Sequence, residues 1–376
     1  MATRRGQGET ALGMVNVPCV PPNWQQGDIA LRRRGGNHTR LVALPRWRRV
    51  LLRAVVVTVQ LIIALGLLFG AAPTKAQRQP VPHVGLLNYA GPNDIRAKQF
   101  SDALSALGYR EGTNLKLTHR WADGKMEELP VLAAQLVADK VDVIIALGPA
   151  VWAAKKATNT IPIVIAFSGD PVGQNVVESL AKPGGNITGF SYMSTDLAEK
   201  RLELLSQYFS KTKRVAVLFS VHEPATAREL QRMDDVAPGF GVTLVRAPVG
   251  NPDELDQAFS DAIGQGADAM MVLTHGFAVL NADRIMALAA RHKMPLLYGW
   301  HDFVVQGGLL SYGPDIELLV RRAAGYVDRL LRGEKPANLP VEQPARLLLS
   351  INVNTARSLG IAVPESLLLR ADRIIE

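Results

Sequence analysis

The chain has 376 residues and a formal net charge of +8. This excess positive charge lies in residues 1–76, which hold 11 Lys/Arg against Glu9 and Asp28, whereas residues 77–376 hold 31 Lys/Arg and 32 Asp/Glu. The body of the chain therefore lacks the basic face with which a protein displaces counterions from a phosphate backbone, and we expect no nucleic-acid partner.

The N-terminal part indicates export. Residues 1–45 are rich in Gly, Arg, Pro and Asn and read as a disordered leader or a mis-assigned start. Residues 46–76 combine a basic flank, an uncharged apolar run at 54–70 and small residues at their end, which is typical of a signal peptide cleaved near Gln77. The alternative is an uncleaved inner-membrane anchor at 54–70, because a spanning helix needs roughly 17–25 residues. In the favoured interpretation the mature protein is periplasmic.

Cysteine usage adds a constraint. Cys19 is the only cysteine and precedes the apolar run. The exported part therefore can form neither a disulfide nor a cysteine-linked lipid anchor.

From residue 80 onward, short apolar strands alternate with amphipathic helices, which predicts an α/β fold with parallel sheets covered on both faces. The expected strands lie at 83–87, 115–119, 141–147, 161–167 and 186–190, and the expected helices at 92–107 and 127–139. A further helix is expected to begin with Asp196 and Glu199 as a capping pair.

The strand pattern then repeats. Residues 214–219 resemble 83–88, residues 267–271 resemble 141–145, and residues 294–297 resemble 161–164, at offsets of 131, 126 and 133 residues. Three matches in the same order at nearly one offset predict two similar Rossmann-like lobes in tandem.

The last segments are too short for a third domain. A helix at 316–331, a strand at 339–353 and a short helix at 354–359 are expected to cross back between the lobes and form a multi-strand hinge. We expect the first lobe to comprise 80–190 plus 313–338, and the second lobe 191–312 plus 339–376. A hinge between two lobes makes a cleft that closes on a ligand.

Ligands of open α/β sheets bind outside the carboxyl ends of the strands. This rule, with the first crossover added, predicts a binding site formed by Asn88, Tyr89, Gly148, Pro149, Ala150, Asp170, Ser191, Tyr192, Ser220, His275, Gly276 and Trp300. Trp152 is expected in the core rather than in the cleft, because it stands at the start of a helix.

Catalytic and metal-binding motifs are not found in the sequence. It has no Gly-x-Ser-x-Gly elbow, no His-Glu-x-x-His, no Walker loop and no Gly-x-Gly-x-x-Gly after the first strand. The histidines are dispersed without paired spacing. We therefore expect no enzyme, no metal and no cofactor, with an enzyme that uses the same cleft as the rival hypothesis.

Several short sequence segments after residue 80 resemble those of one known family. They are VDVIIA at 141–146, GDPV at 169–172, KPGGNITG at 182–189, KRLELL at 200–205, GGLLSYG at 307–313 and LPVEQP at 339–344. Together they resemble the substrate-binding proteins of ABC transporters, specifically the family with tryptophan- and tyrosine-binding members. The resemblance covers 84–376. It implies a type I periplasmic-binding-protein fold and delivery of a small solute to permease subunits in the membrane. We also expect a monomer.

We expect the ligand to be a small amino-acid-like or aromatic solute. Asp170 is expected to pair with its ammonium group, with a turn-capping role before Pro171 as the equal alternative. Trp300 and Tyr89 are expected to supply aromatic faces from opposite lobes. A third class of function, a sensory protein that passes its closed state to a partner, stays open.

Overall fold

In the computed structural model, the described residues are 80–209, 212–223, 226–273 and 275–376, with Trp47 and residues 50, 51 and 54–61 nearer the N-terminus. The chain divides into two units, Met1–Gln77 and Arg78–Glu376. The predicted leader at 1–45, residues 62–70 of the apolar run and the predicted cleavage site lie outside the described residues. Among the residues that are described, no helix has the length and apolar character needed to cross a membrane.

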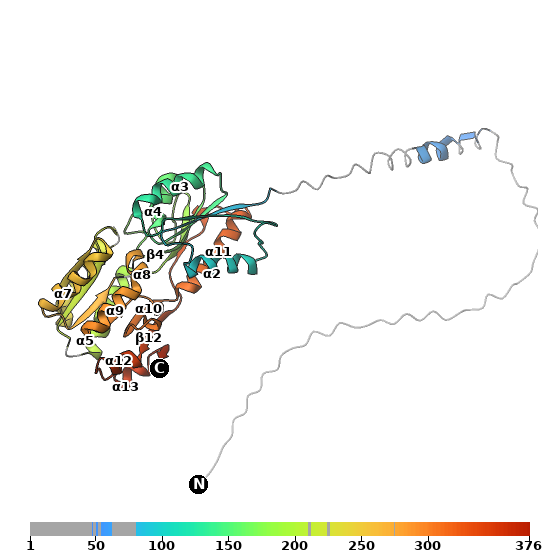
Figure 1. Cartoon of the computed structure of the whole chain (residues 1–376). Coiled ribbons are helices and arrows are strands. Elements are labelled where there is room, and N and C mark those ends of the chain that lie inside the picture. The colour runs from blue at the N-terminus through green and yellow to red at the C-terminus, as the bar shows by residue number, and fades with distance from the viewer. Residues whose placement is uncertain are drawn as a thin grey trace, which may run out of the picture. The chain divides into compact units, whose positions relative to one another are not determined.

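The second unit contains two sheets (Figure 1). The first sheet has the order β11-β5-β4-β3-β1-β2, and its neighbouring strands are parallel throughout. Its strands are β1 (His83–Asn88), β2 (Lys116–Trp121), β3 (Val143–Leu147), β4 (Ile163–Ser168), β5 (Ile187–Ser191) and β11 (Val341–Glu342). Strands β1, β3 and β4 are buried along their whole length, as expected of strands covered on both faces.

Helices cover both faces of this sheet, and together they form the first lobe. They are α2 (Ile95–Ala106), η1 (Met126–Glu128), α3 (Leu129–Ala138), α4 (Ala150–Ala157), α11 (Ile316–Leu331) and η4 (Pro336–Asn338). Helices α2 and α11 pack together on one face, and α3 and α4 on the other. Helix α11 begins where predicted because Asp315 caps it: the Asp315 Oδ1 accepts from the backbone N–H of Leu318 at 3.0 Å.

The second sheet has the order β13-β12-β10-β9-β8-β6-β7 and is parallel except for the antiparallel pair β10–β12. Its strands are β6 (Arg214–Ser220), β7 (Thr243–Val249), β8 (Ala269–Val272), β9 (Leu296–Tyr298), β10 (Leu310–Pro314), β12 (Leu347–Asn352) and β13 (Arg373–Ile375). An antiparallel strand near one end of a parallel sheet is common in large α/β sheets.

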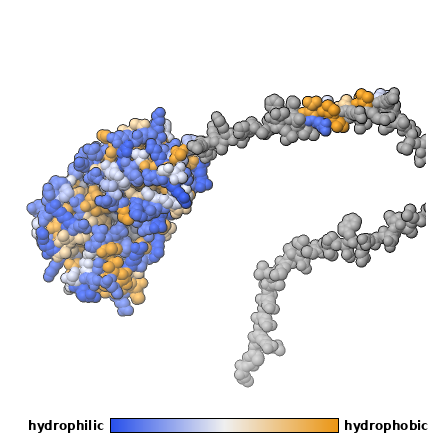
Figure 2. Space-filling view, turned by 45° about the vertical axis from the view of Figure 1, so that its right-hand side comes forward, coloured by the Kyte–Doolittle hydropathy of each residue, from blue (hydrophilic) through white to orange (hydrophobic). Residues whose placement is uncertain are grey.

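The second lobe is this sheet with its helices. They are α5 (Ser194–Tyr208), α6 (Thr226–Val236), η2 (Ala237–Phe240), η3 (Pro252–Glu254), α7 (Leu255–Gly264), α8 (Gly276–Leu280), α9 (Ala282–His292), α10 (His301–Val305), α12 (Val353–Ser358) and α13 (Glu365–Leu368). The apolar sides of α7 and α9 join one core cluster, and those of α5 and α6 join another on the opposite face. Hydrophilic side chains cover most of the visible surface of this unit (Figure 2).

The predicted tandem repeat is confirmed. The first sheet contains the order β4-β3-β1-β2 and the second contains β9-β8-β6-β7, so equivalent strands hold equivalent places. The register agrees as well, since Val84 pairs with Val143 and its counterpart Val215 pairs with Ala269.

The chain crosses between the sheets three times: after β5, after β10 and after β11. The exact lobe boundaries stay a prediction, and the pairing differs from them at β11. Val341 pairs with Gly189 of β5 in the first sheet, although 339–376 were assigned to the second lobe. Gly189 has a φ of 134°, and a Cβ there would lie 2.2 Å from the Ile165 carbonyl oxygen, so only glycine fits in this strand.

The predicted capping pair of Asp196 and Glu199 is wrong. Helix α5 begins at Ser194, after Met193 with a left-handed φ of 56°. Contacts at the first crossover decide this start, because the Ser191 hydroxyl accepts from the Met193 N–H and the Ser194 N–H donates to the Gly169 carbonyl. The predicted strand at 339–353 is likewise two strands, β11 and β12, separated by residues 343–346.

Candidate functional site

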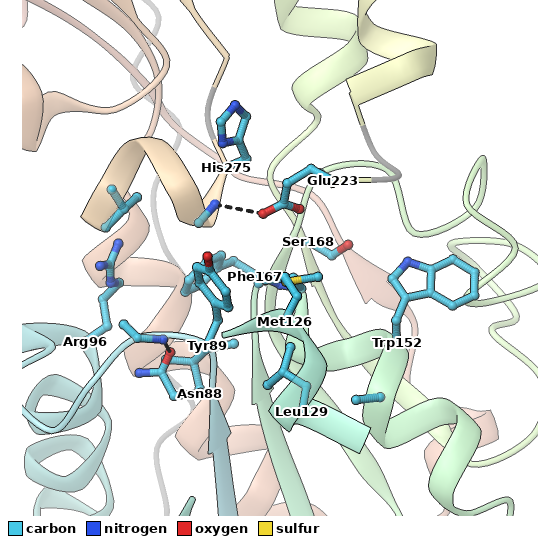
Figure 3. Close-up of a pocket in the computed structure, with 18 of the residues that line it drawn as sticks. Asn88, Tyr89, Arg96, Met126, Leu129, Trp152, Phe167, Ser168, Glu223 and His275 are labelled. Atoms are coloured by element: carbon cyan, nitrogen blue, oxygen red, sulfur yellow. Dashed lines mark hydrogen bonds between the residues drawn. The ribbon is translucent and has the colours of Figure 1, made fainter. Parts of the chain in front are cut away.

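A cavity of about 430 Å³ lies between the lobes, at the carboxyl ends of the central strands. The first lobe contributes the residues after β1, β3 and β4 and the facing sides of α3 and α4. The second lobe contributes residues after β6, β8 and β9. Figure 3 shows these side chains converging from opposite directions.

Eight of the twelve predicted site residues line this cavity. They are Asn88, Tyr89, Gly148, Pro149, Tyr192, His275, Gly276 and Trp300. The other four, Ala150, Asp170, Ser191 and Ser220, do not line it. Ala150 and Ser191 are buried, and the Ser220 hydroxyl accepts from the His222 N–H. The rule of strand ends therefore selects loops that line the cavity, but not each side chain that lines it.

A charged pair that was not predicted from the sequence, Asp94 and Arg96, lies just after β1. Asp94 caps helix α2, and its carboxylate accepts from the Arg96 Nε at 2.7 Å and from the Asn88 Nδ2 at 2.8 Å. The Arg96 guanidinium in turn lies over two aromatic rings, 5.5 Å from the centroid of Trp300 and 5.9 Å from that of Phe167. Arg96 thus stacks on rings from both lobes while it is paired with Asp94.

Three aromatic side chains of the cavity wall, Phe167, Tyr192 and Trp300, contact one another. The Trp300 ring stands edge-on to Phe167 and to Tyr192, with centroids 5.6 and 5.7 Å apart. Trp300 is only 3% exposed, and its indole N–H has no hydrogen-bond partner among the described residues. Burial also raises the pKa of Tyr192 far above its ordinary value, so this phenol is neutral at physiological pH.

Trp152 forms part of the cavity wall, which contradicts its expected place in the core. It is half-buried on α4, and its indole N–H donates to the Gln174 Oε1 at 3.1 Å. Met126, Leu129 and Pro130 line the cavity from the same lobe. The turn of α4 that buries Val151 and Ala154 against the sheet leaves Trp152 on the side that faces the cleft.

Glu223 enters from the second lobe, in the loop after β6. Its Oε1 accepts from the Gly276 backbone N–H at 3.1 Å, and it is 8% exposed. Burial raises the pKa of this carboxyl to about 7, with the Gly276 N–H acting in the opposite direction. Tyr89 lies on the other side of the cleft, and burial together with the charge of Glu223 raises its pKa to about 12.

His275 lines the cavity, but both of its ring nitrogens contact backbone nitrogens. Nε2 accepts from the Ser220 N–H at 3.0 Å, and Nδ1 lies 3.3 Å from the Ala278 nitrogen at the start of α8. Burial lowers the pKa of the imidazole to about 3, so the ring is neutral. His275 thereby fixes the loop that presents Gly276 to the cavity.

Asp170 is engaged elsewhere. Its Oδ1 accepts from the Gly173 N–H at 2.8 Å, which is the turn-capping role, and its Oδ2 lies 3.4 Å from the Nε of Arg228 on α6. Asp170 therefore contacts the second lobe beside the cavity instead of facing a ligand within it. Within the described ranges, no group of three His, Cys, Asp or Glu residues is placed to hold a metal ion.

Comparison with known proteins places this geometry in a family. The model for ABC transporter substrate-binding proteins matches residues 91–375. The chain belongs to this family. A curated tyrosine-binding protein of Clostridioides difficile (strain R20291) is 31% identical over 270 residues, which cover 71% of this chain and 77% of the relative.

Solved structures agree with the assignment. An ABC domain in complex with L-Trp from Streptococcus pneumonia has a TM-score of 0.73 at 26% identity, covering 78% of this chain and 99% of that one. The ligand-free, open structure of a substrate-binding protein with adhesive properties from Clostridium difficile has a TM-score of 0.58 at 25% identity, covering 79% and 99%. The predicted type I periplasmic-binding-protein fold is confirmed. Substrate-binding proteins of ABC transporters bind solutes outside the cytoplasm.

Sequence reasoning missed the four charged residues of the cavity, Asp94, Arg96, Lys156 and Glu223. One signal was present: Asp94 follows the first strand at helix-cap spacing, and N-terminal caps stand at the carboxyl ends of parallel strands. Arg96 and Glu223 carried no such signal, because their direction depends on contacts with Asp94 and Gly276.

Proposed function

We propose that this substrate-binding protein closes its two lobes on an aromatic, amino-acid-like solute and delivers it to the permease of an ABC importer. The observation that carries the proposal is the cavity between the lobes, walled by aromatic and aliphatic side chains and supplied with few polar groups. Aromatic side chains line the cavity from both lobes, with Tyr89, Trp152 and Phe167 on one side and Trp300 on the other.

Arg96 supports an amino-acid-like ligand. Its Nε is engaged by Asp94, whereas its two terminal nitrogens carry no hydrogen bond to any described residue. A guanidinium with free N–H groups suits the carboxylate of a solute, because it can donate two parallel hydrogen bonds.

Two relatives favour the same ligand class. One is named for tyrosine binding and another was solved with L-Trp. The TM-score is higher with the L-Trp complex than with the ligand-free, open structure, 0.73 against 0.58 at nearly equal identity. This difference is in line with a closed arrangement of the lobes here.

The ligand is tested by titrating purified protein with L-Trp, L-Tyr, L-Phe and L-Leu in a calorimeter, with thermal unfolding in parallel. An aromatic amino acid is expected to raise stability by about 2.7 kcal/mol at a hundredfold excess over its Kd. Preference for L-Leu, or no binding of the aromatic set, would refute the proposed ligand class. Turnover of a bound ligand would favour the rival enzyme hypothesis.

Delivery and export need separate tests. We propose a periplasmic mature protein that begins near Gln77 and works as a monomer with its permease. N-terminal sequencing of the exported protein is expected to find Gln77 or a close neighbour. An intact N-terminal segment in the membrane fraction would support the anchored alternative.

A further inference from the structure

The cavity contains one acidic side chain without a cationic counterpart. Asp94 is matched, since Arg96 and Asn88 both donate to its carboxylate. Glu223, in contrast, takes part in no ion pair among the described residues, and its carboxylate accepts a hydrogen bond from the Gly276 N–H. Figure 3 shows its carboxylate at the wall of the cavity, with one oxygen joined to that N–H.

Two described titratable side chains next to Glu223 carry no positive charge. Tyr89 faces it across the cleft and its phenol is neutral, because its pKa is raised to about 12. His275, on the adjacent loop, is also neutral, because burial lowers its pKa to about 3. A carboxylate withdrawn from water without a cation is unfavourable, and burial raises the pKa of Glu223 accordingly.

The alternative acceptor for a ligand cation in this region is already used. Asp170 pairs with Arg228 and caps its own turn, and it lies outside the cavity wall. Lys156, on α4 of the first lobe, also lines the cavity, but among the described residues it forms no ion pair with Glu223. Glu223 is therefore the acidic group of the cavity that still lacks its partner.

Resting on the proposed function, we propose that Glu223 accepts the ammonium group of the solute, so that the site selects primary amines with an aromatic body. The amine then completes the charge balance of the closed cleft, and the aromatic body lies against Trp152, Met126 and Leu129. Because Glu223 belongs to the second lobe and this apolar wall to the first, one ligand contacts both lobes. Such a ligand favours the closed state, since its contacts with both lobes exist together only there.

The test compares three kinds of probe at pH 8: L-Trp and L-Tyr, their deaminated acids 3-(indol-3-yl)propionate and 3-(4-hydroxyphenyl)propionate, and tryptamine. The wild-type protein is expected to bind the amine-bearing probe roughly 30-fold or more tighter than the matched deaminated acid. Glu223→Gln keeps the hydrogen bond from Gly276 and is expected to remove that preference. Its affinity for the deaminated acids is expected to stay equal or to rise.

Glu254→Gln is the matched control, because the Glu254 carboxylate also accepts from a backbone N–H, that of Gly250 at 2.6 Å, but is exposed and does not line the cavity. It is expected to bind every probe like the wild type. Thermal unfolding of each ligand-free variant verifies folding.

The outcomes separate the two proposals. If L-Trp or L-Tyr binds equally well to the wild type and to Glu223→Gln, the role of Glu223 is refuted and the proposed function stands. If tryptamine alone binds and needs Glu223, the amino-acid ligand is refuted and the role of Glu223 stands. If no amine-bearing probe binds, or the wild type prefers the deaminated acids, the proposed role of Glu223 is overturned.

Discussion

Arg228 on α6 and Asp170 after β4 link the two lobes, with the Nε and Oδ2 atoms 3.4 Å apart. The Nη1 of Arg228 also donates to the Gly173 carbonyl at 2.7 Å. Both acceptors belong to one first-lobe loop, whereas α6 packs in the second lobe. These contacts can form only when the lobes are close together.

Removing this link is expected to shift the ligand-free protein toward an open state. Because Arg228 is 59% exposed, the pair contributes roughly 0.2–1 kcal/mol, so Arg228→Ala should weaken ligand affinity by at most about fivefold. Small-angle scattering should show a larger radius of gyration without ligand. Arg232→Ala is the control, since Arg232 pairs with Glu199 inside the second lobe. Unchanged dimensions and affinity in Arg228→Ala would mean that the link has no part in closure.

A methyl group at Gly276 is expected to hold the lobes apart. A Cβ at this position would lie 2.5 Å from the Cδ1 of Tyr89, which belongs to the opposite lobe. Gly276→Ala should therefore weaken binding about tenfold or more, because the closed state must shift the Tyr89 ring. Gly264→Ala at the end of α7 meets no atom within 4 Å and serves as the control. Calorimetric titration measures the ligand affinity of both variants. Equal affinities would show that the Tyr89 ring moves aside freely.

Loss of the Trp152 indole is expected to weaken binding of an aromatic solute by about tenfold, because a ring pair contributes roughly 0.5–1.5 kcal/mol beyond the buried area. Trp152→Ala should leave most of the stability of the ligand-free protein intact, since this side chain is only half-buried. Trp121→Ala is the matched control: it removes another half-buried tryptophan that does not line the cavity. A similar loss of affinity in both variants would point to a general effect on the fold.

Stability is expected to depend on pH through Glu223. Its folded-state pKa of about 7 lies above its ordinary value of 4.5, so its favourable contribution is complete below pH 4.5 and is lost as the pH rises through 7. At pH 8, Glu223→Gln should be more stable than the wild type by up to about 3 kcal/mol, and the gain should disappear near pH 4.5. Urea unfolding at both pH values measures this difference. A difference that does not vary with pH would show that Glu223 titrates normally.

The sequence predicts the architecture well, because buried parallel strands are continuous apolar runs and because the same order of strands occurs twice. Segments such as 141–147 and 161–167 can be identified as buried strands from their own residues alone. The starts of helices fixed by distant contacts were not predictable: Ser194 begins α5 because its N–H reaches Gly169, 25 positions earlier.

The candidate site was predictable only at the level of loops. Asn88 ends β1, Tyr89 and Trp300 follow strand ends, and all three line the cavity, as the strand-end rule predicts. Asp170 follows a strand end too, yet its carboxylate is held by its own turn and by Arg228. Side-chain direction is set by such pairings, which the order of residues alone does not reveal.

Three chain crossings between the sheets, after β5, β10 and β11, restrict how one lobe can move against the other. A single connector would let the lobes rotate freely, whereas three connectors resist twisting and leave hinge bending as the main motion. Each closure therefore returns the same atoms to the same mutual positions. We expect this repeatability to help the largely apolar cavity discriminate between solutes of similar size.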